Sequence, residues 1–306
     1  MLAPPWPVDR MRRVPLLLPM VAAASASVFF GASVAATRFV VAGIDPLMLA
    51  LLRYVIGVLC LLPFVAVRTR AKLSSRDVCG VALLGVVFFG LFPWLFSAGL
   101  QFIPASRAAV WLAAMPFLTF ALAVVLRREA FTGSKGWGIA LATVGALLAL
   151  GRTDLGAIGE RAWLGDFLLF ATACCGAIYF VMSRALLKRL PALLVTWLSM
   201  VAGVLFLACV AFGTERLALP RLEATGWMVV AFLGTFGAAL GFFLWLWALQ
   251  HLTPTTTAVF LTLNPIAATL LAVGLLGEQV GVSFLFGLTL VLFGIIVANW
   301  QGRRAQ

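Results

Sequence analysis

A side-chain amide and a proline lie next to each other inside the strongly apolar stretch 257–279. An amide that faces lipid is costly, so Asn264 should point into the protein, where it can meet a polar partner or a small molecule. The alternative is structural, because Asn264 can satisfy backbone carbonyl groups that Pro265 leaves without a partner. The first interpretation makes Asn264 a substrate contact, and the second makes it a local support.

Helical spacing extends this candidate site to neighbouring side chains. Residues three and four apart share one side of a helix, and the stretch 108–130 carries a face that matches the one around Asn264. If the two faces oppose each other, they frame a cavity with aromatic walls and one amide, suited to a small molecule with a hydrophobic part. The cavity candidates are Thr257, Phe260 or Leu261, and Asn264 on one face, and Ala108, Trp111 or Leu112, and Met115 on the other.

Two prolines, Pro116 and Pro265, lie near the centres of the apolar stretches 104–126 and 255–276. A proline has no backbone N–H, so each leaves the carbonyl group four residues earlier without its helical partner, and the helix bends. The bend is either a hinge that opens and closes a cavity or a static kink. The matching positions favour the hinge.

Aromatic side chains gather in two further stretches, "FFGLFPWLF" at 88–96 and "GFFLWLW" at 241–247. Such side chains can stack on an apolar substrate, although they more often fill a core or face lipid. Tyr179 is a stronger individual candidate, because a buried hydroxyl needs a hydrogen-bond partner. The candidates of this kind are Trp94, Ser97, Phe243, Trp245 and Tyr179.

Few charged or amide side chains lie in or beside the apolar stretches. Glu129 and Glu278 stand at helix ends that water reaches, so pairing with cations or free N–H groups is favoured over proton transfer. Arg53, the one charge well inside a stretch, can reach outward, pair with Asp45 or bind a substrate carboxylate. The residues assigned a structural polar role are Glu129, Glu278, Gln101, Gln250 and Arg53.

Residues for catalysis or metal binding are missing from the apolar stretches. The five cysteines show neither metal-ligand spacing nor a disulfide pattern. His251 is the only histidine, and one histidine without nearby carboxylates makes no convincing metal site or proton relay. An intramembrane enzyme would need paired acids, a metal cluster or a nucleophile with its base. We therefore expect no catalytic residue, no metal and no cofactor.

The elements that position these residues must be membrane-spanning helices. The chain is 64% hydrophobic and 10% charged, against about half and about a quarter in soluble domains. A helix needs about 20 apolar residues to cross a bilayer. The sequence therefore predicts an all-α integral membrane protein of ten helices, at roughly 14–37, 46–67, 78–98, 104–126, 133–151, 163–184, 192–213, 225–248, 255–276 and 281–299.

Basic residues are distributed unevenly between the two sides of such a bundle. With the N-terminus in the cytoplasm, the inner connections collect most of the Arg and Lys and the outer ones most of the acids. This positive-inside pattern places both termini in the cytoplasm, and it explains the formal charge of +12 without nucleic acid. The inner cations are Arg10, Arg12, Arg13, Arg68, Arg70, Lys72, Arg76, Arg127, Arg128, Lys135, Arg184, Lys188, Arg189, Arg303 and Arg304.

The first apolar run has a second interpretation. Basic residues followed by an apolar run and small residues imitate a cleavable signal peptide. The run 14–37 is long enough to span, however, and its removal would leave nine helices and an unpaired first half. We predict that it is the first helix.

The chain repeats itself without a gap at an offset of 149 residues. The sequence therefore predicts two related halves of five helices each, residues 1–151 and 152–306. Because five is odd, the halves lie in opposite directions in the membrane. Inverted repeats are typical of secondary transporters, which expose one central site to each side in turn. The least coincidental matches are Gln101 with Gln250, Pro116 with Pro265, Glu129 with Glu278, Gly138 with Gly287, and Gly145 with Gly294.

Several motifs are similar to those of a known family. They are "PLMLALLRY" at 46–54 and the twin pattern of Ala-Val, Pro, Leu-Ala-Val and Glu in 109–129 and 258–278. With the ten-helix duplication, the chain resembles the drug/metabolite transporter superfamily, EamA family, and within it the YddG-type exporters of aromatic and other hydrophobic amino acids. The first copy departs from the pattern, because it has "LRREAF" where the second has "LLGEQV". The resemblance implies amino-acid export across a bacterial inner membrane.

Together these features predict a secondary transporter that works by alternating access and exports small hydrophobic or aromatic amino acids or related metabolites. Away from the helix ends, none of the ten predicted helices contains an acidic residue, which favours uncoupled transport down a gradient. A proton-coupled drug or metabolite exporter, a channel and an intramembrane enzyme are the alternatives. The expected partners are the lipid bilayer and a small-molecule substrate, and we expect a monomer that is not an enzyme.

Overall fold

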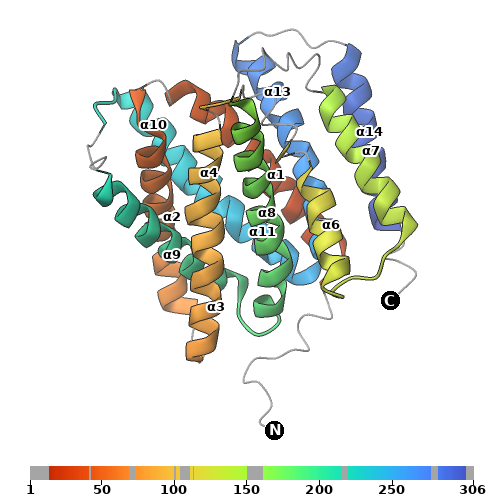
Figure 1. Ribbon diagram of the computed structural model, residues 1–306, viewed down its shortest axis with the longest axis horizontal. Coiled ribbons are helices and arrows are strands. Elements are labelled where there is room, and N and C mark those ends of the chain that lie inside the picture. Colours follow the sequence, from red (N-terminus) through yellow and green to blue (C-terminus); the bar gives the residue numbers. More distant parts are fainter. Residues whose placement is uncertain are drawn as a thin grey trace.

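Helices account for all of the regular structure in the computed structural model. It describes residues 14–40, 43–68, 73–99, 101–103, 111–112, 114–149, 161–214, 220–276 and 282–300, and these ranges contain no strand. The helices stand side by side in a bundle (Figure 1). The all-helical class predicted from the apolar runs is confirmed for this part of the chain.

Six helical segments are long and apolar enough to cross a membrane. Two of them, residues 75–99 and 224–251, are composite, since each contains a π-helical turn between two α-helices. Six segments of this length and composition make the chain a multi-pass membrane protein. The segments are α1 (Leu17–Val40); α2 (Pro46–Arg68); α3 (Ser75–Gly85), η3 (Val86–Leu91) and α4 (Phe92–Gly99); α8 (Ala162–Leu187); α9 (Ala192–Gly213); and α10 (Ala224–Phe232), η4 (Leu233–Leu240) and α11 (Gly241–His251).

The other four predicted spans contain shorter helices. In the span predicted at 255–276 the helix is also interrupted by a short 3-10 turn. These helices are α6 (Met115–Val125), α7 (Gly133–Ala149), α12 (Pro254–Val259), the 3-10 turn η5 (Phe260–Thr262), α13 (Leu263–Leu276) and α14 (Val282–Trp300).

The two π-helical turns lie at matching positions, because the 149-residue offset maps 86–91 onto 235–240, within η4. Glycines at these turns let a neighbouring helix come close. A Cβ atom on Gly85 would lie 2.3 Å from the carbonyl oxygen of Ser199 in α9. On Gly234 it would lie 2.5 Å from the Cβ of Ile56 in α2. Both approaches are too close for any side chain, which explains the need for glycine.

The two prolines, Pro116 and Pro265, occupy different positions relative to the helical segments around them. Pro265 cannot donate a hydrogen bond to the carbonyl group of Leu261, and the helix changes to the 3-10 turn η5 just before it. Pro116 instead lies in the first turn of α6, which begins at Met115. A first helical turn tolerates proline well, since its N–H groups have no helical partner.

α7 and α14 lie side by side at one edge of the bundle (Figure 1). A Cβ on Gly138, early in α7, would lie 2.4 Å from the backbone nitrogen of Ala298, late in α14, whereas one on Gly145 would lie 2.7 Å from the Gly287 carbonyl oxygen. The two helices are therefore antiparallel and touch through their backbones. Small residues favour such close contact in membranes.

One end of the bundle collects the connections that carry basic residues, and we call it the basic end. Arg189, between α8 and α9, forms an ion pair with Asp77 of α3 at 2.9 Å. Arg184 donates to the carbonyl oxygen of Leu249 at 2.9 Å, which joins α8 to α11. The described cations in these connections and in the adjoining helix ends are Arg76, Arg127, Arg128, Lys135, Arg184, Lys188 and Arg189.

Candidate functional site

Aromatic side chains from α1, α2, η3, α8 and α11 pack against one another, and we call them the aromatic cluster. Neighbouring ring centroids lie 4.4 to 6.5 Å apart, in stacked, tilted and edge-to-face pairs. These are the favoured arrangements of aromatic pairs. The members are Phe30, Tyr54, Phe88, Phe89, Tyr179, Phe180, Phe242 and Trp245.

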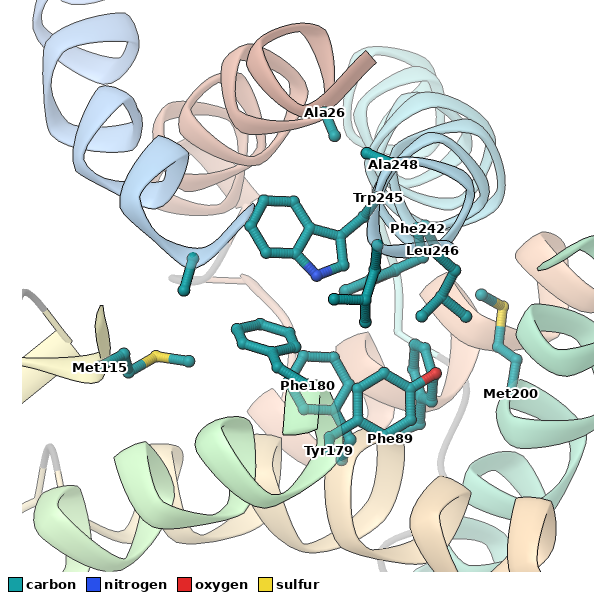
Figure 2. Packing of buried hydrophobic residues seen from close by; sticks show 14 of the residues in the cluster. Ala26, Phe89, Met115, Tyr179, Phe180, Met200, Phe242, Trp245, Leu246 and Ala248 are labelled. Atoms are coloured by element: carbon teal, nitrogen blue, oxygen red, sulfur yellow. The ribbon is translucent and has the colours of Figure 1, made fainter. Parts of the chain in front are cut away.

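Trp245 is fully buried within this cluster. Its ring centroid lies 5.1 Å from that of Phe180 and 6.0 Å from that of Phe30. Figure 2 shows the indole nitrogen turned toward the side on which Phe180 and Tyr179 lie. Among the residues that the structure describes, the N–H has no hydrogen-bond partner, although leaving a buried donor unpaired costs about 1–3 kcal/mol. This donor is free to bind a group that enters the cluster.

Tyr179 stacks on Phe88, with centroids 4.4 Å apart and the rings nearly parallel. Its hydroxyl is buried on the side of Ser199 and makes no hydrogen bond of ordinary geometry with any described residue. Ser199 itself donates to the carbonyl oxygen of Val81 at 3.5 Å, a long contact. The cluster thus has a second buried polar group with spare hydrogen-bonding capacity.

Asn264 lies in the first turn of α13, where α13 crosses α1. Its side-chain oxygen is buried and has no hydrogen-bond partner within the described part of the chain. Its backbone oxygen lies against Gly31 of α1, where a Cβ would be only 2.4 Å away. The amide oxygen is an acceptor, so it complements the Trp245 donor as a contact for a polar group.

Three more of the predicted cavity residues are buried, and two of them, Met115 and Phe260, belong to the same hydrophobic core as the aromatic cluster. Met115 extends from α6 with the end of its side chain against Gly176 of α8. Phe260 lies in the 3-10 turn η5 and is 5% exposed. Thr257 is fully buried, and its hydroxyl donates to the Thr253 carbonyl oxygen at 2.9 Å. Thr257 therefore supports its own helix.

The candidates Leu112 and Leu261 pack against the same hydrophobic core, whereas Trp111, Trp94 and Phe243 make no ring contact with the cluster among the described residues. The Trp111 indole donates to a carboxylate oxygen of Asp166 at 3.0 Å, near the end of the bundle opposite the basic end. Trp94 is 44% exposed, and Ser97 donates to the Pro93 carbonyl oxygen at 2.8 Å. Phe243 is only partly buried, and the ring contacts of α11 are made by Phe242, Trp245 and Trp247. Ala108 and the side chain of Pro265 lie outside the described part of the chain.

Two of the predicted structural polar residues, Glu129 and Gln250, make contacts near helix ends. Glu129 pairs with Lys135 and accepts a hydrogen bond from the Thr255 N–H at 3.0 Å, which joins the α6–α7 connection to α12. Gln250 donates to the Leu187 carbonyl oxygen at 2.9 Å. Gln101 is exposed. Glu278 lies outside the described residues.

Arg53 lies inside the bundle, on α2. Its guanidinium donates to the carbonyl oxygen of Gly237 in η4 at 3.3 Å. Asp45, one of the partners predicted for Arg53, accepts hydrogen bonds from the Leu47 and Met48 N–H groups at the start of α2. A π-helical turn exposes carbonyl oxygens that an α-helix would use, which gives the buried cation an acceptor.

Six of the eight cluster members are not among the candidates predicted from the sequence: Phe30, Tyr54, Phe88, Phe89, Phe180 and Phe242. The signal for Phe242 was present, because it precedes Trp245 by three residues and so shares its helix face. Among the described residues, no group of three or more His, Cys, Asp and Glu side chains could hold a metal ion.

The six apolar spans define a multi-pass integral membrane protein, and a buried aromatic cluster lies within its bundle. The sequence profile of the EamA-like transporter family matches residues 17–151 and, a second time, residues 163–300. The chain therefore belongs to the EamA-like transporter family, within the drug/metabolite transporter superfamily, whose members are membrane transporters.

Individual relatives carry transporter names. The chain is 24% identical over 277 residues to the uncharacterized transporter YyaM of Bacillus subtilis, covering 89% of this chain and 90% of that one. It is 24% identical over 290 residues to the uncharacterized inner membrane transporter YedA of Escherichia coli K12, covering 92% and 91%. It is 28% identical over 235 residues to a probable terminal-alkyne amino-acid exporter of Streptantibioticus cattleyicolor, covering 76% and 77%. A crystal structure with 18% identity has the same fold, with a TM-score of 0.79 over 94% of this chain and 98% of the other.

Proposed function

We propose that the protein exports small hydrophobic or aromatic amino acids, or related metabolites, and binds them in the aromatic cluster. The observation that carries this proposal is the Trp245 N–H, a fully buried donor without an acceptor among stacked rings. The rings would hold an apolar side chain by stacking. The Trp245 N–H and the Asn264 side-chain oxygen would receive the polar groups of the substrate.

The proposed architecture is ten helices in two inverted halves, residues 1–151 and 152–306, with both termini in the cytoplasm. Two observations support it. The family profile matches once in each half. The antiparallel helices α7 and α14 also exchange equivalent contacts, because Gly145 lies against Gly287 as Gly294 lies against Gly138. A pseudo-two-fold axis between two oppositely oriented copies would produce this reciprocity.

Both proposed halves contribute to the aromatic cluster, Phe30 to Phe89 from the first and Tyr179 to Trp245 from the second. Movement of one half against the other would therefore open the cluster first to one side and then to the other, as alternating access requires. We propose a monomer that moves its substrate down a gradient, without a coupling ion.

Efflux from liposomes tests this function. Purified protein is reconstituted, the vesicles are loaded with labelled L-phenylalanine, L-leucine or L-aspartate, and release is compared with protein-free vesicles. We expect faster, saturable release of the first two and no gain for aspartate. Release that requires a pH gradient would indicate proton coupling, and release that does not saturate would indicate a channel. Equal release with and without protein would refute the assignment.

A further inference from the structure

A cavity of about 110 Å³ opens at the basic end, beside the aromatic cluster. It lies between the α6–α7 connection, the last turns of α8 and the start of α12. A space of this size is large enough to admit a small polar group such as a carboxylate. Its walls are Arg128, Glu129, Val181, Arg184, Ala185, Lys188, Thr253 and Pro254.

The charge of this cavity is predominantly positive. Three cations, Arg128, Arg184 and Lys188, face one carboxylate, Glu129. That carboxylate is already engaged, since it pairs with Lys135 and accepts from the Thr255 N–H. The cations therefore determine the charge that an entering molecule meets.

The three cations differ in their burial and in the hydrogen bonds that their side chains make. Arg184 is partly buried and donates to the Leu249 carbonyl oxygen at 2.9 Å, which fixes its position at the wall. Arg128 and Lys188 are exposed, and no hydrogen bond or ion pair of their side chains is found among the described residues. Their N–H groups are free to bind an oxyanion, which guanidinium and ammonium groups both favour.

The cavity adjoins the aromatic cluster through α8. Val181 lines the cavity and directly follows Tyr179 and Phe180, which belong to the cluster. Arg184 and Lys188 follow on the same side of α8, at a spacing of three and seven residues from Val181, as one helix face requires. A molecule held by its head at Lys188 and Arg184 would have its apolar end directed along α8 toward these rings.

We propose that this cavity is an entry site that captures the carboxylate of the transported molecule at the basic end, before its apolar part passes into the aromatic cluster. This inference rests on the proposed function and adds to it that substrates need a free carboxylate. The cations would raise the local concentration of the anionic group, an effect that salt weakens.

The test compares two double variants that remove the same charge from the same end. Arg128→Gln with Lys188→Gln removes two cavity cations, whereas Arg76→Gln with Arg127→Gln removes two exposed cations outside the cavity. L-phenylalanine is supplied on the basic face of oriented proteoliposomes made of neutral phosphatidylcholine. We expect the cavity variant to raise KM about five-fold at low salt with kcat unchanged, and the control variant to match the wild type.

Two analogues identify the group that is recognised. 3-Phenylpropionate, which keeps the carboxylate, should inhibit the wild type about five times more strongly than the cavity variant, whereas phenethylamine, which lacks it, should not distinguish the two. Equal KM values for the cavity and control variants would overturn the entry site. It would also be overturned if the cavity variant lost inhibition by phenethylamine as much as inhibition by 3-phenylpropionate. A difference that appears only after phosphatidylglycerol is added would also overturn it, because the cavity would then hold a lipid phosphate.

Thermal unfolding separates this inference from the proposed function. 3-Phenylpropionate should raise the melting temperature of the wild type and of the control variant, but not that of the cavity variant. A melting shift without any transport would refute the exporter assignment and keep the anion site. Transport with no difference between the two variants would keep the exporter and refute the site.

Discussion

Some helix crossings make the same contacts in both halves of the chain, and others do not. The crossing of α7 with α14 is of the first kind. The equivalent crossings of α6 with α8 and of α13 with α1 are of the second kind. At the first, Gly145 meets the backbone of Gly287 and Val291, and Gly294 meets the backbone of Gly138 and Ala142, which are the equivalent positions. Where α6 crosses α8, Met115 touches Gly176 with the end of a flexible side chain. Its counterpart Asn264 touches Gly31 with its backbone and keeps an unpaired amide.

This difference separates scaffold from site. A contact that is the same on both sides only has to hold two helices together, so glycine suffices in both copies. A substrate is not symmetric, so the residues that bind it must differ between the copies. Asn264 and Trp245 differ in this way, because each carries a buried polar group where its counterpart, Met115 or Phe96, has none.

The largest expected effect is at the symmetric crossing. Gly145→Ala and Gly294→Ala would each place a Cβ within 2.7 Å of backbone atoms of the partner helix. Each should lower the free energy of unfolding by about 2–3 kcal/mol, and by about the same amount. Thermal melting of the two purified variants measures this, and a large effect at one glycine alone would contradict the reciprocity.

The crossings of α13 with α1 and of α6 with α8 should lose unequal amounts of stability when their glycines are replaced by alanine. Gly31→Ala meets the Asn264 backbone oxygen at 2.4 Å, whereas Gly176→Ala meets the terminal methyl group of Met115. Since a methionine end can move and a backbone cannot, we expect a loss of about 2–3 kcal/mol for Gly31→Ala and less than about 1 kcal/mol for Gly176→Ala. Similar melting temperatures for the two variants would disprove the asymmetry.

Asn264→Leu should affect transport but not folding. The substitution removes a buried acceptor that has no partner, so the melting temperature should stay the same or rise. Export of L-phenylalanine should fall about ten-fold, as loss of one buried hydrogen bond to a substrate implies. Met115→Leu is the control at the equivalent position and should change export less than about two-fold. Unchanged export by Asn264→Leu would remove this residue from the site.

Trp245→Phe should give the smallest effect. It keeps an aromatic ring but removes the unpaired N–H, which makes the second half resemble the first, where Phe96 is the counterpart. We expect KM for L-phenylalanine to rise about five-fold, or about 1 kcal/mol. Trp94→Phe makes the same change at a side chain that is 44% exposed and should leave KM unaltered. Equal KM values in both variants would argue against a role for the Trp245 donor.

The sequence predicted helix positions better than helix rotation. Apolar runs must match the bilayer thickness, so the spans around α2 and α9 were predicted to within a residue or two. Lipid and protein core are both apolar, however, so an apolar residue does not reveal which one it faces. This is why Phe243 was selected, although its neighbour Phe242 joins the rings.

Polar candidates were easier to place than aromatic ones. A buried amide or hydroxyl has few acceptable surroundings, and Asn264 and Tyr179 both lie inside the bundle. Trp111 was not distinguishable in this way, because its partner Asp166 lies 55 residues further along the chain and no local pattern links the two.

The π-helical turns η3 and η4 add a kind of motion that proline bends do not offer. Each holds one residue more than an α-helix would in the same length, and hydrogen bonds can be exchanged stepwise so that this surplus residue migrates along the helix. As it passes, every side chain turns by about 100° around the helix axis while the axis stays in place. For Phe88 and Phe89 in η3, such a screw-like step would swing the rings in or out of the aromatic cluster without tilting a helix in the membrane.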